Sequence, residues 1–219
     1  MWCIAALTQE YRQRMYHLLE LYALPLRRNE PVVCVDEKSL QLLAHSRAPL
    51  PMQPGSPRKE DYEYVRRGTC NLFVAVQPKA GARTVIVTKQ RGKTDFVTFV
   101  RCLLTTTYRK ARRLHLVLDN LNTHFAKSFV DVLGARRAAK LLRRVRFHYT
   151  PKHASWLNMA EIEIGVLTRQ CLRTRFDACD TLQRHVQAWQ QRRNRERRKI
   201  DWTFTKQAAD AKLRCHYVS

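Results

Sequence analysis

The amino-acid sequence predicts an α/β protein with a mixed sheet. Five runs rich in β-branched and aromatic residues are typical of strands, and helical patterns follow the third, fourth and fifth of them. The first three runs come without an intervening helix, and Lys79 to Gly81 form a tight turn between two of them. Strands that alternate with helices favour parallel pairing. We therefore expect a sheet that is antiparallel at one edge and parallel in the centre.

The predicted elements begin with an amphipathic helix over residues 7–26, which ends near Pro25 because proline cannot continue a helix. Residues 44–68 hold four prolines and two glycines, so we expect a long functional or mobile loop there. Strands are expected over residues 32–39, 69–78, 82–90, 112–120 and 144–151. Helices are expected over residues 93–111 and 123–135, within 149–167, and over 180–196.

Composition and charge indicate a nucleic-acid partner. The chain has 219 residues, and its 41 Lys and Arg against 18 Asp and Glu give a formal net charge of +23. Such a charge favours binding to a polyanion, most often nucleic acid, through the release of counterions. A basic protein that is merely soluble is the alternative that charge alone leaves open. No run approaches the ~20 apolar residues of a membrane span, so no association with a membrane is expected.

The seven cysteines are scattered along the chain and form no C-x-x-C pair. This pattern predicts neither a disulfide framework nor a zinc site. Cys34, Cys102 and Cys171 lie among apolar neighbours, which is typical of small buried hydrophobic side chains. We therefore expect a protein of a reducing cytoplasm.

Acidic residues follow two of the predicted strands. Asp36 and Glu37 end the first run, and Asp119 ends the fourth, with Asn120 and His124 shortly after it. The carboxyl ends of parallel strands meet at one edge of a sheet, where α/β proteins bind their ligands. Because carboxylate oxygens bind hard cations, the two aspartates together predict a metal site. For either aspartate alone, a turn that caps the next helix is the more frequent role.

Two glutamates, Glu161 and Glu163, lie in the apolar segment 149–167. On a helical wheel of ~100° per residue they fall on opposite flanks of an apolar stripe that includes Trp156, so periodicity does not choose between them. Glu161 shares its side with Asn158 and a glycine, which suits a metal-binding carboxylate. Glu163 has bulkier neighbours, and we expect it to be solvated or salt-bridged at the edge of the helix. We expect Trp156 to pack in the core, with an approach to DNA as the alternative.

Three motifs occur in a fixed order: VVCVDEKS, LVLDNLNTH and TPKHASWLNMAEIEIGVL. Together they resemble the catalytic domain of bacterial insertion-sequence transposases related to the mariner transposons, in the DDE superfamily. The resemblance covers about residues 31–176 and implies a ribonuclease H-like fold, which agrees with an α/β fold whose mixed five-stranded sheet is flanked by helices. It also implies a metal-binding triad, which is matched motif by motif to Asp36, Asp119 and Glu161. Glu163 has no counterpart as a ligand.

The resemblance implies two Mg²⁺ or Mn²⁺ ions at this triad, DNA cleavage at the ends of a mobile element, and strand transfer into target DNA. The implied partners are double-stranded DNA and a second copy of the chain, as a homodimer on paired ends, in the bacterial cytoplasm and at the nucleoid when bound to DNA. Side chains near the triad would orient ligands or phosphate, or serve only as caps. These are Glu37, Asn120, His124 and Asn158.

Basic side chains are candidates for contacts with the DNA backbone. The segment 134–146 accommodates a longer connection between the second and third acids than the mariner pattern has, and the segment 192–199 forms a basic tail. A run of charge is more often only a solvated face. The individual candidates are Lys152, His153, Arg136, Arg137, Lys140, Arg143 and Arg144.

The resemblance divides the chain into a helix and linker remnant over residues 1–30, a DDE catalytic domain over 31–176, and a helix with a basic tail over 177–219. Relatives carry helix-turn-helix domains ahead of the catalytic domain, and about 30 residues are too few for one. We therefore expect a fragment, a split reading frame or a truncated copy. The alternatives are a copy that only binds DNA, or another ribonuclease H-like nuclease that cleaves without strand joining.

Overall fold

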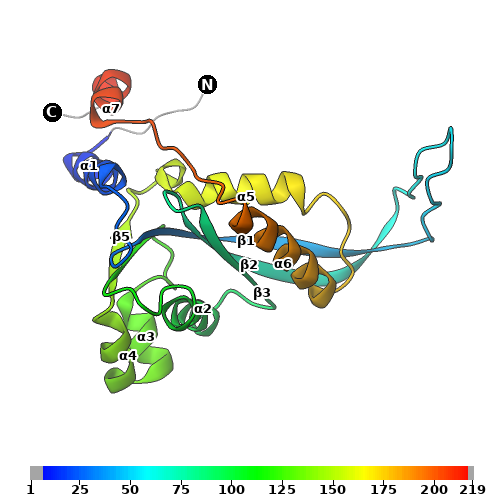
Figure 1. Ribbon diagram of the computed structural model, residues 1–219, viewed down its shortest axis with the longest axis horizontal. Helices are drawn as coiled ribbons and strands as arrows, with labels where there is room; N and C mark the ends of the chain where they lie inside the picture. The colour runs from blue at the N-terminus through cyan, green and yellow to red at the C-terminus, as the bar shows by residue number, and fades with distance from the viewer. Residues whose placement is uncertain (1–6, 217–219) are drawn as a thin grey trace.

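The computed structural model describes residues 7–216, apart from the side chain of Cys215. A five-stranded sheet with the order β3-β2-β1-β4-β5 forms its centre (Figure 1). β1 pairs antiparallel with β2 and β2 antiparallel with β3, whereas β1–β4 and β4–β5 are parallel. The predicted mixed α/β sheet is confirmed, although its parallel half reaches the β5 edge instead of staying in the centre. The strands are β1 Val32–His45, β2 Tyr64–Gln77, β3 Ala82–Thr88, β4 Leu114–Leu118 and β5 Val145–Tyr149.

Helices cover both faces of the sheet, as the strand alternation requires. Val33 and Val35 of β1 face the cluster that packs against α2, whereas Cys34 faces the start of α5. Figure 1 shows α2, α3 and α4 on one side of the sheet and α5 and α6 on the other. The helices are α1 Gln9–Ala23, α2 Lys93–Thr105, α3 Ala126–Leu133, α4 Ala135–Leu142, α5 Met159–Gln170, α6 Cys179–Arg195 and α7 Lys206–Leu213, with short 3-10 helices at Ser155–Leu157 and Arg214–His216.

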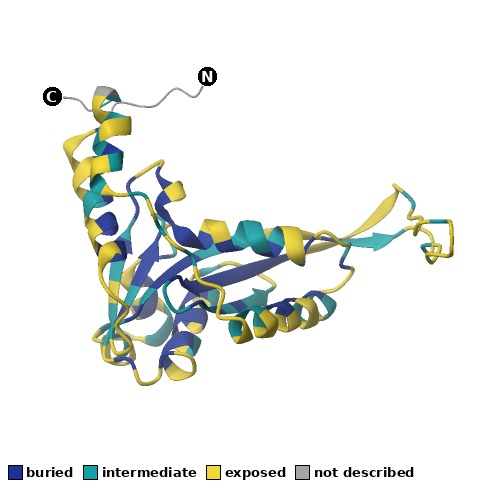
Figure 2. Ribbon diagram, turned by 45° about the horizontal axis from the view of Figure 1, so that its top comes forward, coloured by how far each residue is buried: buried dark blue, intermediate teal, exposed yellow. Residues whose placement is uncertain are grey.

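The first two strands extend into an arm beyond the body of the protein (Figure 1). Pairing between β1 and β2 continues to His45↔Tyr64, so the loop that joins them covers only residues 46–63. The prediction of a loop over residues 44–68 is therefore wrong at both of its ends. The antiparallel ladder continues there through both apolar and polar residues, because backbone hydrogen bonds form whatever the side chain. The outer part of the arm is largely exposed (Figure 2).

Two segments for which no helix was predicted are helical. The basic segment 134–146 contains α4, and the region after the predicted tail contains α7. α7 lies beside α1, and Arg12 forms an ion pair with Asp210 at 3.2 Å. Because Met15 and Leu18 of α1 are fully buried in one cluster with Cys34 of β1, the first helix is packed onto the sheet.

Helix α6 covers the edge of the sheet at β3. The Gln190 side chain accepts a hydrogen bond from the Val85 backbone at 2.6 Å, and Gln183 accepts one from the Val87 backbone at 3.0 Å. Asn194 both accepts from and donates to the backbone of Arg83, at 2.8 and 2.9 Å. An edge strand presents unpaired N–H groups, and these amide side chains satisfy them in place of another strand.

The cysteines differ from the sequence prediction. Cys70 of β2 and Cys179 of α6 form a disulfide although 109 residues separate them, which the scattered spacing gave no sign of. Cys34 is buried as predicted, whereas Cys102 and Cys171 are only half-buried. Within residues 7–216, none of the helices combines the length and the apolar character needed to cross a membrane.

Candidate active site

Asp36 and Asp119 lie on neighbouring parallel strands at the point where β4 ends. The register pairs Cys34 with Val117, and Asp119 follows Leu118, the last residue of β4. Asp36 therefore lies inside the long β1 strand, not at its end as the sequence suggested, yet its position matches the carboxyl end of β4. Since side chains alternate along a strand, Asp36 shares the face of Cys34, which packs against the start of α5.

The charges of the predicted triad act on one another. The pKa of Asp36 is raised from 3.8 to about 6, mainly by burial, and further by the negative charges of Asp119, Glu161 and Glu37. The hydrogen bond from the Glu37 backbone N–H, at 2.7 Å, opposes this shift. The fold thus brings Asp119, at the end of β4, and Glu161 of α5 close enough to Asp36 of β1 to disfavour the ionised form of Asp36.

Asn158 fixes the start of α5 against β1. Its side-chain oxygen accepts a hydrogen bond from the Ala160 backbone at 3.1 Å and so caps the helix. Its side-chain nitrogen donates to the backbone carbonyl of Val35 at 2.9 Å, one residue before Asp36. Asn158 is fully buried. It therefore sets the distance between the strand that carries Asp36 and the helical turn that carries Glu161.

His124 is buried between two carboxylates. Its Nδ1 lies 2.7 Å from Oδ1 of Asp119, and its Nε2 lies 2.8 Å from Oε1 of Glu37. Burial lowers the pKa of His124, but the hydrogen bonds to Asp119 and Glu37 outweigh it and raise the pKa to about 9. The ring is consequently an imidazolium at neutral pH, and both of its N–H groups donate. This arrangement fixes the orientation of the Asp119 carboxylate.

The other predicted site residues make their hydrogen bonds away from the triad or are exposed. Asn120 donates to the Thr150 carbonyl at 2.6 Å and accepts from Arg14 of α1 at 3.3 Å, so it connects the ends of β4 and β5 to the first helix. Lys152 and His153 are exposed in the turn after β5, where His153 has a φ of 61°. Four candidates for DNA contacts are exposed on or just after α4: Arg136, Arg137, Lys140 and Arg143.

Arg144 has a different role from the one the sequence suggested. Its guanidinium donates to the backbone carbonyls of Leu104, Tyr108, Arg109 and Ala111, at 3.2, 2.9, 3.1 and 3.0 Å. These carbonyls lie at the end of α2 and in the turn after it, where the helix leaves acceptors without partners. Arg144 therefore closes the end of α2 and does not present its charge to DNA.

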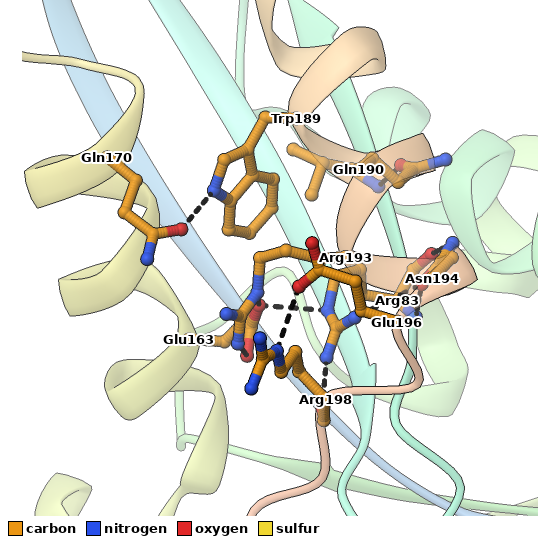
Figure 3. Close-up of polar contacts among 10 residues, drawn as sticks. Arg83, Glu163, Gln170, Trp189, Gln190, Arg193, Asn194, Glu196 and Arg198 are labelled. Atoms are coloured by element: carbon orange, nitrogen blue, oxygen red, sulfur yellow. Dashed lines mark hydrogen bonds and ion pairs between the residues drawn. The ribbon is translucent and has the colours of Figure 1, made fainter.

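Glu163 and Trp156 also differ from expectation. Glu163 is fully buried and forms ion pairs with Arg83 and Arg193, so it is salt-bridged but not solvated at an edge (Figure 3). Trp156 is 41% exposed and packs edge-on against Phe204, so the prediction of a core position is wrong. The reason is that residues 155–157 form a separate 3-10 helix before α5 begins at Met159. Trp156 is therefore not in phase with the wheel of α5.

The donor set of the triad suits a hard divalent cation. Within residues 7–216, no three His, Cys, Asp or Glu side chains are already arranged tightly enough to hold a metal ion. The pKa of Asp36 is nevertheless raised, mainly by burial and further by the negative charges of Asp119 and Glu161, and a divalent cation would offset those charges. The residues present thus fit Mg²⁺ or Mn²⁺ in the chemistry of their ligands.

The fold is a mixed five-stranded sheet with helices on both faces, and Asp36 lies within reach of the negative charges of Asp119 and Glu161. The family model described as DDE superfamily endonuclease matches residues 31–183, and the chain belongs to this family. A comparison with curated proteins finds no match.

Solved structures of the Mos1 transposase have a similar fold. The chain matches the Mos1 mariner paired end complex with Mn at a TM-score of 0.56 and 16% identity, over 90% of this chain and 60% of that chain. It matches the Mos1 strand transfer complex at a TM-score of 0.56 and 16% identity, over 86% of this chain and 57% of that one. The chain also matches the Mos1 transposase paired-end complex with the left transposon end, at a TM-score of 0.54 and 16% identity. This match covers 90% of this chain and 62% of that chain. The chain thus spans about 60% of the length of these proteins.

Proposed function

We propose that this chain is the catalytic domain of a DNA transposase, which cleaves DNA at the ends of a mobile element and joins the ends to target DNA. The observation that carries the proposal is the meeting of Asp36, Asp119 and Glu161 at one edge of the sheet, in a chain of the DDE endonuclease family. The solved structures of similar fold, which include a paired end complex and a strand transfer complex of Mos1, support the same function.

Asp36, Asp119 and Glu161 would together hold two Mg²⁺ or Mn²⁺ ions. When bound, these ions would supply Lewis-acid activation of a water or a DNA 3′-hydroxyl and stabilise the leaving oxygen. The chain's own contribution is to position the ligands. His124 holds the carboxylate of Asp119, with Glu37 as its second anchor, and Asn158 fixes the helical turn of Glu161 against β1. Asn120, which follows β4, donates a hydrogen bond to the Thr150 carbonyl after β5 and so holds the ends of these two strands together.

Double-stranded DNA is the proposed substrate. A net charge of +23 would favour binding to the phosphate backbone through counterion release. The exposed arginine and lysine side chains of α4 offer one surface for this binding. Lys152 and His153 are exposed in the turn after β5, ahead of the helix that carries Glu161, and would contact DNA near the triad. We further propose that the chain acts as a homodimer on paired ends, in the bacterial cytoplasm and at the nucleoid.

The test is DNA cleavage in the presence of Mg²⁺ or Mn²⁺. Supercoiled plasmid nicking should fall at least about 100-fold in Asp36→Asn, Asp119→Asn and Glu161→Gln, because each removes one charged ligand. Asp131→Asn is the matched control, since Asp131 is an exposed acid paired with Lys93 on the distant α3. Wild-type rates in all three triad variants would refute the proposal.

A second assay separates the proposal from its alternatives. Labelled duplexes with free 3′-hydroxyl ends are incubated with target plasmid, and joined products are counted. Joining by the wild type and none by Glu161→Gln supports a transposase. Nicking without joining indicates another ribonuclease H-like nuclease, and DNA binding without nicking indicates a copy that only binds.

A further inference from the structure

A cluster of charged side chains joins α5, β3 and α6 (Figure 3). Glu163 of α5 is fully buried, and so is Arg83 of β3. Nε of Arg83 lies 2.9 Å from Oε1 of Glu163 as an ion pair. Arg193 of α6 binds the same carboxylate in a bidentate manner: its Nε donates to Oε1 at 2.9 Å and its NH2 group donates to Oε2 at 3.3 Å. One carboxylate therefore joins three elements that are distant in the sequence.

The remaining groups of the cluster fix the two arginines in place. The Arg83 guanidinium donates to the backbone carbonyl of Arg198 at 2.5 Å and to the side chain of Asn194 at 3.4 Å. Arg193 also lies over the ring of Trp189, at 5.5 Å from its centroid. Because α6 is hydrogen-bonded along β3 as well, Arg83 and Arg193 form a frame that cannot move independently of the sheet.

Glu163 connects this frame to the helix of the triad. Glu161 and Glu163 are separated by about 200° around the helix and about 3 Å along its axis. Glu161 consequently faces solvent on the side opposite the ion pairs, as its exposure shows. Asn158 fixes the first turn of α5 against β1, and Met159, Ala160 and Leu167 pack the apolar side of the helix into the core. Apolar packing is non-directional, whereas the two ion pairs of Glu163 are directional contacts that fix the rotation of the helix more narrowly.

We infer that Glu163 is a positioning residue: its ion pairs with Arg83 and Arg193 fix the rotation of α5, so that Glu161 is presented to Asp36 and Asp119 for metal binding. This inference rests on the proposed function of the triad. It goes beyond the expectation that Glu163 is solvated or salt-bridged at the helix edge, because Glu163 is salt-bridged but buried. It also explains why a buried ionic cluster is maintained at this point, where apolar side chains would fill the same space without fixing an orientation.

The test measures Mn²⁺ binding by the metal-free protein, with free Mn²⁺ followed by its electron paramagnetic resonance signal. Groups that orient metal ligands typically change metal affinity by about 10- to 100-fold. Glu163→Gln should therefore bind Mn²⁺ about 10- to 100-fold more weakly than the wild type. Glu196→Gln is the matched control, because Glu196 is an exposed acid of the same region that pairs with Arg198, and it should bind as the wild type does.

Two further variants separate positioning from a loss of stability. Arg144→Ala weakens the end of α2, far in the sequence from this cluster, and should lower the thermal midpoint without changing Mn²⁺ affinity. Arg193→Lys keeps the charge of the cluster but loses the two-pronged geometry, so it gives a folded variant if Glu163→Gln does not fold. It should bind Mn²⁺ at least about threefold more weakly, a smaller effect than complete removal of the carboxylate.

The outcomes are distinguishable. Wild-type Mn²⁺ affinity in a folded Glu163→Gln, or in Arg193→Lys where Glu163→Gln fails to fold, overturns the positioning role alone. A loss of the same size in Arg144→Ala also overturns it, since affinity would then follow stability. A wild type that binds Mn²⁺ no better than Asp36→Asn overturns the proposed function, and with it the role given to Glu163.

Discussion

Replacement of Arg144 by alanine should destabilise the fold and leave DNA binding unchanged. Three N–H hydrogens on NH1 and NH2 of Arg144 are directed at four carbonyls at the end of α2. A hydrogen bond from a charged group contributes about 1.5–3 kcal/mol, but this site is half-exposed and water replaces part of the loss. We therefore expect Arg144→Ala to lower the free energy of unfolding by about 2–4 kcal/mol.

Urea denaturation followed by circular dichroism measures this loss. With a slope of about 3 kcal/mol per molar urea, the midpoint should fall by roughly 1 M. Arg143→Ala is the control, since Arg143 is the exposed neighbour, and its midpoint should stay within about 0.2 M of the wild type. The salt dependence of DNA binding should change in Arg143→Ala only. A wild-type midpoint in Arg144→Ala, together with weaker DNA binding, would refute the assignment.

Two further predictions concern the triad and a turn. Ionisation of Asp36 opposes folding by at most about 3 kcal/mol, because its folded-state pKa is about 6 against the ordinary 3.8. This cost is complete above about pH 6 and vanishes below about pH 4. Asp36→Asn should therefore stabilise the metal-free protein by about 1–3 kcal/mol at pH 8 and not at pH 4, as measured by thermal unfolding. A gain in stability that is the same at both pH values would contradict the prediction. Gly81→Ala should cost at least about 3 kcal/mol in urea denaturation, because Gly81 has a φ of +64° and a Cβ there would lie 2.4 Å from the carbonyl oxygen of Arg197. Gly55→Ala, at φ +76° in open space, should cost only about 1–2 kcal/mol, and equal losses would show that the contact is unimportant.

The sheet was predictable from the sequence because its signal is local. Runs such as Val32 to Val35 and Leu114 to Leu118 are apolar enough to be strands in nearly any surroundings. The apolar run of β1 ends at Asp36 and that of β4 just before Asp119, so the two aspartates could be placed together without knowledge of their contacts, although β1 itself continues to His45. The ends of β1 and β2 were misjudged for the opposite reason: residues 40–45 and 64–68 mix apolar and polar side chains, and they form strands because they pair with each other.

The role of Glu163 could not be predicted, because it depends on residues far away in the chain. A helical wheel gives the angle between Glu161 and Glu163 but not which of them faces the sheet. That choice is made by Arg83, 80 residues earlier on an edge strand, and by Arg193 on α6, which come together only in the folded protein. The pairing of Cys70 with Cys179 is a second case of the same kind.

The distribution of buried charge supports a division of labour among the acids around this edge. Glu37 binds the His124 imidazolium and Glu163 binds two guanidinium groups, so each of these carboxylates is neutralised by cations that the fold itself supplies. Asp36 is different, because its pKa is raised by burial and by the acids around it and not lowered by a cation of the chain. In a protein with 41 Lys and Arg, a cationic partner was readily available, and the fold instead places Asp119 and Glu161 beside it. A divalent cation bound beside Asp36 would therefore offset the negative charges of Asp36, Asp119 and Glu161.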